Sequence, residues 1–310
     1  MSQFFSAFQS IGPLFLVILV GMVVSRNKSV DHQWLEILNN YALWIGFPAL
    51  ILVALSRLQW DINLYGKLIG WNSARIVIPM LLVFPVSLLL KLRNNTRRTL
   101  FLAVSYGNVA YLGIPVLRST YGDQILPEAT MISSVYIFWM FTLGIFLVEY
   151  FGDHKVHLKE LLLRLVTNPL LIAVFIGIFI AINHIRLPKI VLSGLDIFAN
   201  SVTAVVLFSL GLFMGKQPLG KLRDWWPVLI FSLAILFVLP FLFFLISKLF
   251  VELPTSRAWI LESAMPMGLT AYALCLKYKL NTGFASRVVV LSTLLALLSL
   301  PFWLVFLSKV

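Results

Sequence analysis

Two apolar segments of this chain are interrupted by residues that break helices and that could offer polar groups to a ligand. They run from Tyr106 to Pro115, with two glycines, an asparagine and a proline, and from Glu262 to Gly268, with a carboxylate, a proline and a glycine. Proline lacks an amide hydrogen and glycine permits unwound backbone, so each segment can divide into two half-helices with free amides and carbonyls. Such groups need partners in an apolar environment, and half-helix N-termini attract anions. The pair of breaks predicts an anion-binding site, whereas a simple proline kink would explain either segment alone.

Two charged side chains stand in apolar surroundings. Arg75 is the only basic residue well inside an apolar run, where an unpaired arginine is costly. We expect it to face the protein interior and to partner a carboxylate; the alternative is a side chain that reaches up to the outer membrane surface. Glu262 precedes Pro266 by one helical turn. Its carboxylate could bind a proton or a cation, or pair with Arg75, unless it lies at the outer end of its span with access to water.

The residue types needed for bond-making chemistry are not placed for it. The four histidines fall in loops or at the ends of apolar runs, and neither an HExxH motif nor a paired-aspartate motif occurs. The one cysteine, Cys275, cannot form an internal disulfide and is expected to be a small buried hydrophobe. The sequence therefore predicts that the protein is not an enzyme and that it uses no cofactor and no metal ion.

Composition places these features in a membrane. Of the 310 residues, 60% are hydrophobic and 12% are charged, whereas a soluble domain is roughly half apolar and a quarter charged. Runs such as Val228 to Ile246 are apolar on every face, which indicates membrane-spanning helices. The first basic residue, Arg26, follows the apolar run 11–24, so this run is expected to be a retained span and not a cleaved signal peptide.

We predict an all-α integral membrane protein with ten transmembrane helices. Apolar runs of the length that a bilayer requires are separated by polar breaks and cover residues 11–25, 35–56, 68–90, 100–117, 128–150, 169–183, 190–214, 225–247, 258–276 and 287–307. The longest break, 151–168, mixes leucines with charged residues, which is typical of a short helix on the membrane surface.

Basic residues are distributed unevenly between the loops. Fifteen Lys and Arg residues follow the odd-numbered spans, and eight lie on the other side of the membrane. Basic loops stay in the cytoplasm, so both termini of this multi-pass protein are predicted to face outside the cell membrane. The same bias explains the net charge of +12 without a nucleic-acid partner.

The two halves of the chain are similar to each other. Pro85 and Pro240 are 155 residues apart, and Pro115 and Pro266 are 151 apart, while half the chain is 155 residues. Each half holds an odd number of spans, so the second must enter the membrane upside down. Inverted repeats are the architecture of alternating-access carriers, whose substrate sites lie at the midplane between repeats. We therefore divide the chain into two five-helix repeats and a cytoplasmic connecting segment, at residues 1–150, 169–310 and 151–168.

The interrupted segments also resemble those of a known family. The stretch from Gly107 to Leu117, followed by Tyr121-Gly122, resembles the fourth-span motif of the auxin efflux carrier family, with its asparagine, Gly-Ile-Pro and trailing Tyr-Gly. Further similarity lies in the C-terminal half, at Met265-Pro266, Gly268, Lys277-Tyr278, Leu291-Ser292-Thr293 and Leu300-Pro301. The ten-span plan extends the resemblance over essentially the whole chain. The long central loop of the larger plant members is absent, which favours a compact, prokaryotic-type member.

The resemblance implies a secondary transporter in which spans 4 and 9 cross near Pro115 and Pro266. It would carry a small organic anion by an elevator-like motion, with spans 3, 4, 5, 8, 9 and 10 moving against a scaffold of spans 1, 2, 6 and 7. The resemblance places Asn108 against the substrate, and we assign the substrate site to residues of the two breaks: Asn108, Tyr111, Gly113, Pro115, Pro266 and Gly268. Asn72 and Arg75 resemble, at a different spacing, an Asp and a Lys of the plant members. With Glu262 they are assigned to coupling or support.

Several alternatives stay open. Tyr136, Trp139 and Trp44 could line a cavity, although the abundance of aromatic residues favours packing roles for each. A sodium-coupled symporter of the bile acid type shares the crossed-helix plan, and a channel or a sensor is a more distant alternative because no selectivity filter is evident. The expected substrate is a carboxylate, auxin-like or dicarboxylic. The sequence does not decide between a proton and sodium as coupling ion, and it does not show the direction of transport. The expected partners besides the substrate are membrane lipid and a second copy of the chain in a homodimer, and the sequence does not determine whether this dimer forms.

Overall fold

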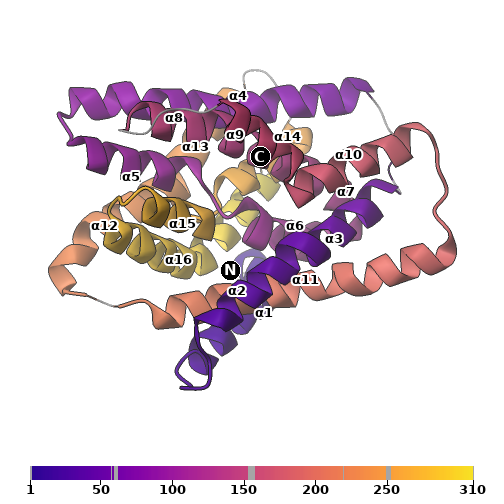
Figure 1. Ribbon diagram of the computed structural model, residues 1–310, viewed down its shortest axis with the longest axis horizontal. Helices are drawn as coiled ribbons and strands as arrows, with labels where there is room; N and C mark the ends of the chain where they lie inside the picture. Colours follow the sequence, from indigo (N-terminus) through magenta and orange to yellow (C-terminus); the bar gives the residue numbers. More distant parts are fainter. Residues whose placement is uncertain are drawn as a thin grey trace.

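The computed structural model describes residues 2–56, 58, 62–152, 158–218, 220–248 and 253–309. These residues form a bundle in which most long helices run along the horizontal direction of Figure 1. Within the described residues, β pairing is limited to one isolated antiparallel bridge between Gly107 and Met267. The α-helices are α1 (Ser2–Val24), α2 (His32–Tyr41), α3 (Phe47–Ser56), α4 (Ile62–Leu89), α5 (Asn94–Ser105), α6 (Ile114–Tyr121), α7 (Leu126–Trp139), α8 (Ile145–Tyr150), α9 (Leu158–Val166), α10 (Pro169–Ile182), α11 (Lys189–Lys216), α12 (Trp225–Leu233), α13 (Leu239–Lys248), α14 (Leu253–Ser263), α15 (Leu269–Lys277) and α16 (Thr282–Lys309).

Seven helical stretches among the described residues are long and apolar enough to cross a membrane. They are Gln3–Val24, Gln33–Ser56, Gly66–Leu89, Asp123–Tyr150, Lys189–Lys216, Leu222–Lys248 and Thr282–Lys309. These stretches coincide with predicted spans 1, 2, 3, 5, 7, 8 and 10. Predicted span 6 is a shorter apolar helix, α10, and the segments predicted as spans 4 and 9 are each divided into shorter helices. The protein is therefore a multi-pass membrane protein.

Four of the membrane segments contain a π-helical turn, in which the backbone hydrogen bonds reach one residue further than in an α-helix. These turns are Ala42–Gly46, Val109–Gly113, Met140–Gly144 and Ala234–Val238. The first joins α2 to α3, the third joins α7 to α8, and the fourth joins α12 to α13. Turns of this kind occur often at functional sites, because the extra residue leaves a carbonyl free to accept another hydrogen bond.

The segment predicted as span 4 is interrupted before its proline. Helix α5 ends at Ser105, residues 106–108 are not helical, and the π-helical turn Val109–Gly113 leads into α6. Pro115 lies beyond the break, within a continuous helical stretch, since Gly113 and Ile114 before it both have right-handed helical backbone angles and the amide of Ile114 donates to the carbonyl of Val109. In predicted span 9, by contrast, Pro266 lies within the interruption itself, between α14 and α15. The proline thus lies in the break of one segment and inside the helical stretch after the break in the other.

Helices α1 and α11 pack with their backbones in contact. Helix α1 lies along α11, and α3 packs against both α10 and α11. A Cβ atom at Gly211 would lie 2.9 Å from the Cα atom of Gly21, and one at Gly21 would lie 3.0 Å from the Cα atom of Gly211. Small residues that let two backbones approach are the usual basis of helix association in membranes. The glycines therefore fix α1 and α11 as a tightly joined pair.

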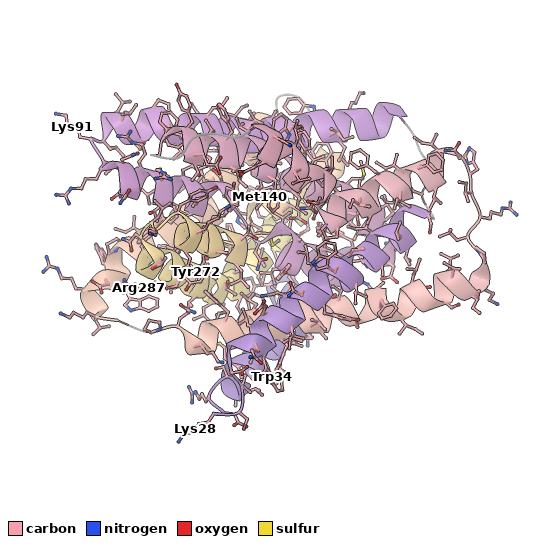
Figure 2. All side chains as sticks on the ribbon, in the orientation of Figure 1. Lys28, Trp34, Lys91, Met140, Tyr272 and Arg287 are labelled. Atoms are coloured by element: carbon pink, nitrogen blue, oxygen red, sulfur yellow. The ribbon has the colours of Figure 1, made fainter. Side chains whose placement is uncertain are left out.

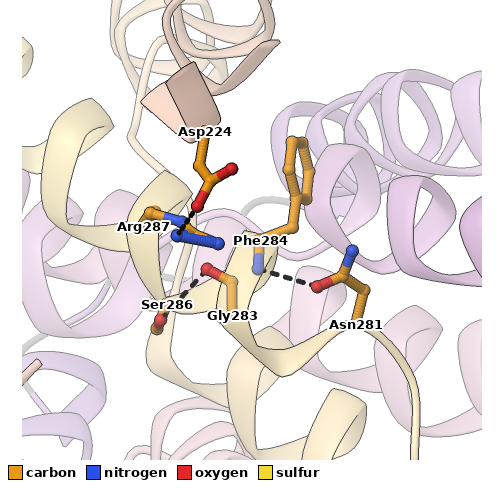
Figure 3. Close-up of polar contacts among 6 residues, drawn as sticks. All are labelled: Asp224, Asn281, Gly283, Phe284, Ser286 and Arg287. Carbon is orange, nitrogen blue, oxygen red and sulfur yellow. Dashed lines mark hydrogen bonds and ion pairs between the residues drawn. The ribbon is translucent and has the colours of Figure 1, made fainter. Parts of the chain in front are cut away.

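Local side-chain hydrogen bonds decide where two of the helices begin. Asn168 caps α10, since its Oδ1 accepts from the amides of Leu170 at 3.0 Å and Leu171 at 3.3 Å. Helix α16 begins at Thr282, earlier than the predicted 287, because the Asn281 side chain accepts from the amide of Phe284 at 2.9 Å. Arg287, which had suggested a loop, lies in this helix and forms an ion pair with Asp224 at 3.1 Å (Figure 3).

The connecting segment contains the helix that the sequence predicted. Helix α9 exposes Leu162, Leu163 and Val166, as expected of a helix lying on a membrane surface. Residues 153–157 of this segment lie outside the described residues. Lys91, which follows α4, and Arg287, near the start of α16, lie at the same end of the molecule, at the left in Figure 2. Two of the loops predicted to be cytoplasmic therefore meet at one end.

Candidate binding site

The two interrupted segments meet and satisfy each other's backbone groups. The amide of Asn108 donates to the carbonyl of Pro266 at 2.7 Å, and the amide of Gly268 donates to the carbonyl of Tyr106 at 2.8 Å. These bonds flank the bridge between Gly107 and Met267. Unwound backbone in an apolar interior must find such partners. We call residues 106–108 and 265–268, joined in this way, the junction.

Glycine is required at the junction because the backbones are so close. A Cβ atom at Gly268 would lie 3.0 Å from the carbonyl oxygen of Gly107 and 3.2 Å from its carbonyl carbon. A Cβ atom at Gly107 would lie 3.4 Å from Tyr136 Oη, which is ordinary contact. Gly268 is thus the position at which a side chain would force the two segments apart.

Two tyrosines link the junction to the helical stretch α7–α8. Tyr136 Oη donates to the carbonyl of Ser105 and accepts from the amide of Gly107. Tyr106 Oη donates to the carbonyl of Met140 at 2.7 Å. Met140 begins the π-helical turn Met140–Gly144, where carbonyls are available to outside donors. The sequence pattern assigns no role to Tyr106 and favours packing for Tyr136; the signal that could have found them is that a buried phenol needs a hydrogen-bond partner.

Arg75 points into the protein and connects three membrane segments. Its side chain is 9% exposed, its Nε donates to Asn72 Oδ1 at 3.0 Å, and its Nη1 donates to the carbonyl of Trp259 at 3.3 Å. Asn72 in turn donates from Nδ2 to the carbonyl of Ile132 at 2.9 Å. The pair on α4 is therefore tied to α14 directly and to α7 through Asn72.

Glu262 is buried with both carboxylate oxygens lacking a hydrogen-bond partner among the described residues. It is 2% exposed, and a Cβ atom at Gly113 would lie 2.5 Å from its Oε2. The Nη2 atom of Arg75 likewise lacks a partner within the same described part of the chain. Arg75 and Glu262 exchange no hydrogen bond there, yet their charges are close enough to act on each other. The direct pair that the sequence allowed is replaced by two buried charges on the walls of one cavity.

That cavity has a volume of about 390 Å³ and lies between the junction and helices α4 and α13. Most of its walls are apolar side chains of α4 and α13. The polar residues of its lining include Arg75, Ser105, Tyr136, Glu262 and Ser263. A few convergent polar groups in an apolar cavity are typical of a site for a small molecule.

The residues assigned to the substrate site do not all lie together: some are close to Asn108 or Glu262, whereas Tyr111 packs against another helix. Asn108 is 5% exposed, and its Nδ2 has no hydrogen-bond partner among the described residues. Pro266 and Gly268 lie beside it through the junction, and Gly113 lies against Glu262. Tyr111 instead stacks on Phe47 of α3, with ring centroids 5.5 Å apart.

None of the six assigned residues belongs to the lining of the 390 Å³ cavity, which takes Gly107, Val109, Met265 and Met267 from the same two segments. Of the other aromatic candidates, Tyr136 lines the cavity, while Trp44 is 59% exposed on the surface of the bundle. Tyr111 and Pro115 are therefore not part of the cavity wall.

The chemistry available at this site is recognition of charge and not bond-making. Arg75 Nη2 and Asn108 Nδ2 are buried donors without partners among the described residues, and a carboxylate oxygen accepts from such donors strongly. Glu262 is an acceptor that a proton or a cation would satisfy. Groups of three or more His, Cys, Asp or Glu residues that could hold a metal ion do not occur in the described ranges.

Known proteins similar to this chain are transporters. Residues 6–304 match the model of a family described as membrane transport protein. An uncharacterised transporter of Methanocaldococcus jannaschii is 23% identical over 299 residues, which is 93% of this chain and 94% of the relative. A Rhizobium meliloti protein, provisionally named a malonate transporter, is 22% identical over 68% of this chain and 67% of its own length. Auxin efflux carrier component 8 of Arabidopsis thaliana is 28% identical over 47% of this chain and 41% of its own length.

Proposed function

Because the chain belongs to the membrane transport protein family, the family of the auxin efflux carriers, we propose that it is a secondary transporter for a small organic anion in the cell membrane. The proposed substrate is a carboxylate, with dicarboxylates favoured because one relative carries the name of a malonate transporter. The observation that carries the proposal is the junction, where two broken helices exchange backbone hydrogen bonds beside buried, unpartnered donors of Asn108 and Arg75. Such a site suits a ligand whose oxygen atoms can accept hydrogen bonds from these donors.

Asn108 is proposed to donate its Nδ2 hydrogens to a carboxylate of the substrate. The amide is nine-tenths buried and lacks a partner among the described residues, so a ligand acceptor would remove the free-energy cost of leaving it unpaired. Gly113, Pro115, Pro266 and Gly268 shape the backbone around it, and Tyr111 closes the side toward α3. The positive charge of Arg75 would offset the negative charge of the bound anion.

Glu262 is proposed to bind the coupling ion. A buried carboxylate without hydrogen bonds is costly in its charged form, so it gains from a proton or a cation. Binding of the substrate anion at Asn108 would strengthen this preference, because negative charges close to each other in an apolar interior repel. Asn72 supports the arrangement by holding the Arg75 guanidinium. A proton is the favoured coupling ion, and sodium is the alternative that the experiment below separates.

Transport is proposed to occur by alternating access of an elevator type. The packing of α1 and α3 with α10 and α11 suits a scaffold of predicted spans 1, 2, 6 and 7, since glycine contacts hold α1 and α11 together. Predicted spans 3, 4, 5, 8, 9 and 10 would carry the junction and the cavity. In this proposal the two groups derive from inverted repeats at 1–150 and 169–310.

The test is ligand-dependent thermal stabilisation of the purified protein. Malonate, other dicarboxylates and monocarboxylates are titrated with and without sodium at two pH values. A substrate that binds only the folded protein raises its melting temperature in proportion to occupancy. We expect one carboxylate class to stabilise the wild type and Asn108→Ala to weaken its binding by about 5- to 150-fold, which corresponds to about 1–3 kcal/mol.

Asn183→Ala is the matched control, because this asparagine is exposed at the end of α10 and bonds only its own helix in the described structure. The control should bind as tightly as the wild type. An Asn108→Ala protein with unchanged affinity would remove Asn108 from the site. Stabilisation that requires sodium at every pH would replace the proton by sodium as the coupling ion, and the absence of stabilisation by every carboxylate would overturn the proposed substrate class.

A further inference from the structure

The helical stretch of α7, its π-helical turn and α8 runs beside both halves of the broken segment α14–α15. Near its start, Glu128 Oε1 accepts from the indole Nε1 of Trp259 on α14 at 2.8 Å. Near its end, Glu149 Oε1 accepts from the phenol of Tyr278, directly after α15, at 2.7 Å. One continuous helical stretch is thus attached to the half-helix before the break and to the half-helix after it.

The two attachments lie at opposite ends of the membrane segment. Glu128 and Glu149 are 21 residues apart in sequence, which at 1.5 Å per residue is about 30 Å, the thickness of the hydrocarbon core. Between them, Tyr136 and Met140 bond the junction through Gly107, Ser105 and Tyr106. The stretch therefore contacts α14, the junction and α15 in order along its length.

The strength of hydrogen bonds to a carboxylate explains why a glutamate forms each of these two attachments. Glu149 is 8% exposed and Tyr278 is 7% exposed, while Trp259 is 1% exposed. Burying a carboxylate carries a desolvation penalty, which strong hydrogen bonds must offset. Bonds from neutral N–H and O–H donors to an ionised oxygen are shorter and about twice as strong as those to a neutral acceptor. Glu149 also lies in charged surroundings, because the guanidinium of Arg98 lies 5.8 Å from the centre of the Tyr278 ring.

We infer that Glu128 and Glu149 are positioning residues, which hold the two halves of the broken segment at a fixed separation and thereby set the geometry of the junction. Helix α14 ends at Ser263 and α15 begins at Leu269, so no continuous helix fixes their spacing. The junction itself supplies two backbone bonds from the other broken segment and one bond from the Met267 amide to Ser292 Oγ at 3.2 Å. The hydrogen bonds of Glu128 and Glu149 at the two ends of α7–α8 therefore make α14, α15 and α7–α8 move together as one rigid unit.

Amide hydrogen exchange at residues 264–268 tests this inference without any substrate. Tyr278→Phe deletes one phenolic hydroxyl and Glu149→Ala deletes its acceptor, and each should speed exchange in this segment by about tenfold or more. Glu149→Gln keeps an acceptor oxygen but loses the charge, so its exchange should fall between that of the wild type and that of Glu149→Ala. Because the Glu149–Tyr278 bond is shared, the double variant Tyr278→Phe/Glu149→Ala should exchange no faster than the faster single variant.

Tyr41→Phe is the matched control. It also deletes one phenolic hydroxyl from a bond between two helices, since Tyr41 Oη lies 2.6 Å from Ser201 Oγ, but this bond joins α2 to α11. The control should leave exchange at 264–268 unchanged even where it lowers the melting temperature. Glu128→Ala should behave as Glu149→Ala does, and if either alanine variant fails to fold, Tyr278→Phe and Trp259→Phe give the answer.

Unchanged exchange at 264–268 in Tyr278→Phe and Trp259→Phe would overturn the inference and leave both glutamates as ordinary packing residues. A second readout, the affinity for the carboxylate that stabilises the wild type, rests on the proposed function. We expect Tyr278→Phe to lower that affinity and Tyr41→Phe to leave it unchanged. Because exchange needs no ligand, a failure of the proposed substrate leaves the first result intact, so the two hypotheses fail separately.

Discussion

Replacing Arg75 by alanine should destabilise the protein by about 3–5 kcal/mol. The guanidinium donates to Asn72 Oδ1 and to the Trp259 carbonyl, and hydrogen bonds of charged groups contribute about 1.5–3 kcal/mol each. Its removal also leaves Glu262 in the same cavity without a nearby positive charge. Protonation of Glu262 would limit that second loss, so most of the expected destabilisation comes from the two hydrogen bonds of the guanidinium. At about 2 °C per kcal/mol for a chain of this size, the melting temperature should fall by roughly 6–10 °C.

Scanning fluorimetry in detergent measures this change, with Arg186→Ala as the control because Arg186 is exposed in the loop after α10. Arg75→Lys keeps the charge but loses the planar fork that reaches both acceptors, so it should fall between wild type and Arg75→Ala. Arg75→Ala/Glu262→Gln removes the stranded charge and should recover part of the loss, with a coupling of about 0.5–3 kcal/mol. A decrease no larger than that of Arg186→Ala would refute the reasoning and make Arg75 energetically equivalent to a surface residue.

Three further predictions follow from the close backbone contacts and the loop charges. Gly268→Ala should lower the affinity for the carboxylate by tenfold or more, because its Cβ would lie 3.0 Å from the Gly107 carbonyl oxygen. The control, Gly70→Ala, places its Cβ in open space and should bind the carboxylate as tightly as the wild type in the same titration. Gly211→Ala should lower the free energy of unfolding by about 1–3 kcal/mol, because its Cβ would press on the backbone of α1. In the same melting experiment, Gly194→Ala on the same helix should match the wild type, because its Cβ would lie in open space. A cysteine at position 95 in a cysteine-free background should resist an impermeant thiol reagent in intact cells while one at position 2 reacts, and the reverse labelling would invert the predicted orientation.

Hydropathy located most of the membrane segments because each apolar run has to cross the same thickness of hydrocarbon. Seven runs appear as long apolar helices, and the run around residues 169–183 appears as α10 with Asn168 as its cap. Helix α16 starts before the predicted boundary because Arg287, whose charge suggests a loop, lies inside the helix. A charge at a helix end costs little when it finds a partner, and Asp224 provides one from a distant loop. The sequence contains no local signal for that pairing.

The interruption of the first broken segment was predicted, but its position relative to the proline was not. Pro115 suggested a break beside it, yet it lies within the continuous helical stretch that runs from Val109 into α6. The non-helical residues lie at Tyr106–Asn108, where Gly107 can approach the other segment. Burial of Arg75 follows from its position in an apolar run, and its acceptor Asn72 lies one helical turn earlier on the same helix; the Trp259 carbonyl, by contrast, could be known only from the way α4 packs on α14.

The hydrogen-bond requirements of the two broken segments explain why a third segment must lie beside them. The junction pairs the amides of Asn108 and Gly268 with carbonyls of the opposite segment, but the carbonyl of Ser105 and the amide of Gly107 face a different direction. In a membrane no water is available to satisfy them, so a side chain has to do so. A single tyrosine hydroxyl can donate and accept at once, and Tyr136 uses both capacities. The break at which we propose that an anion binds therefore also requires α7 as its neighbour, and a Tyr136→Phe substitution would leave both backbone groups without this partner.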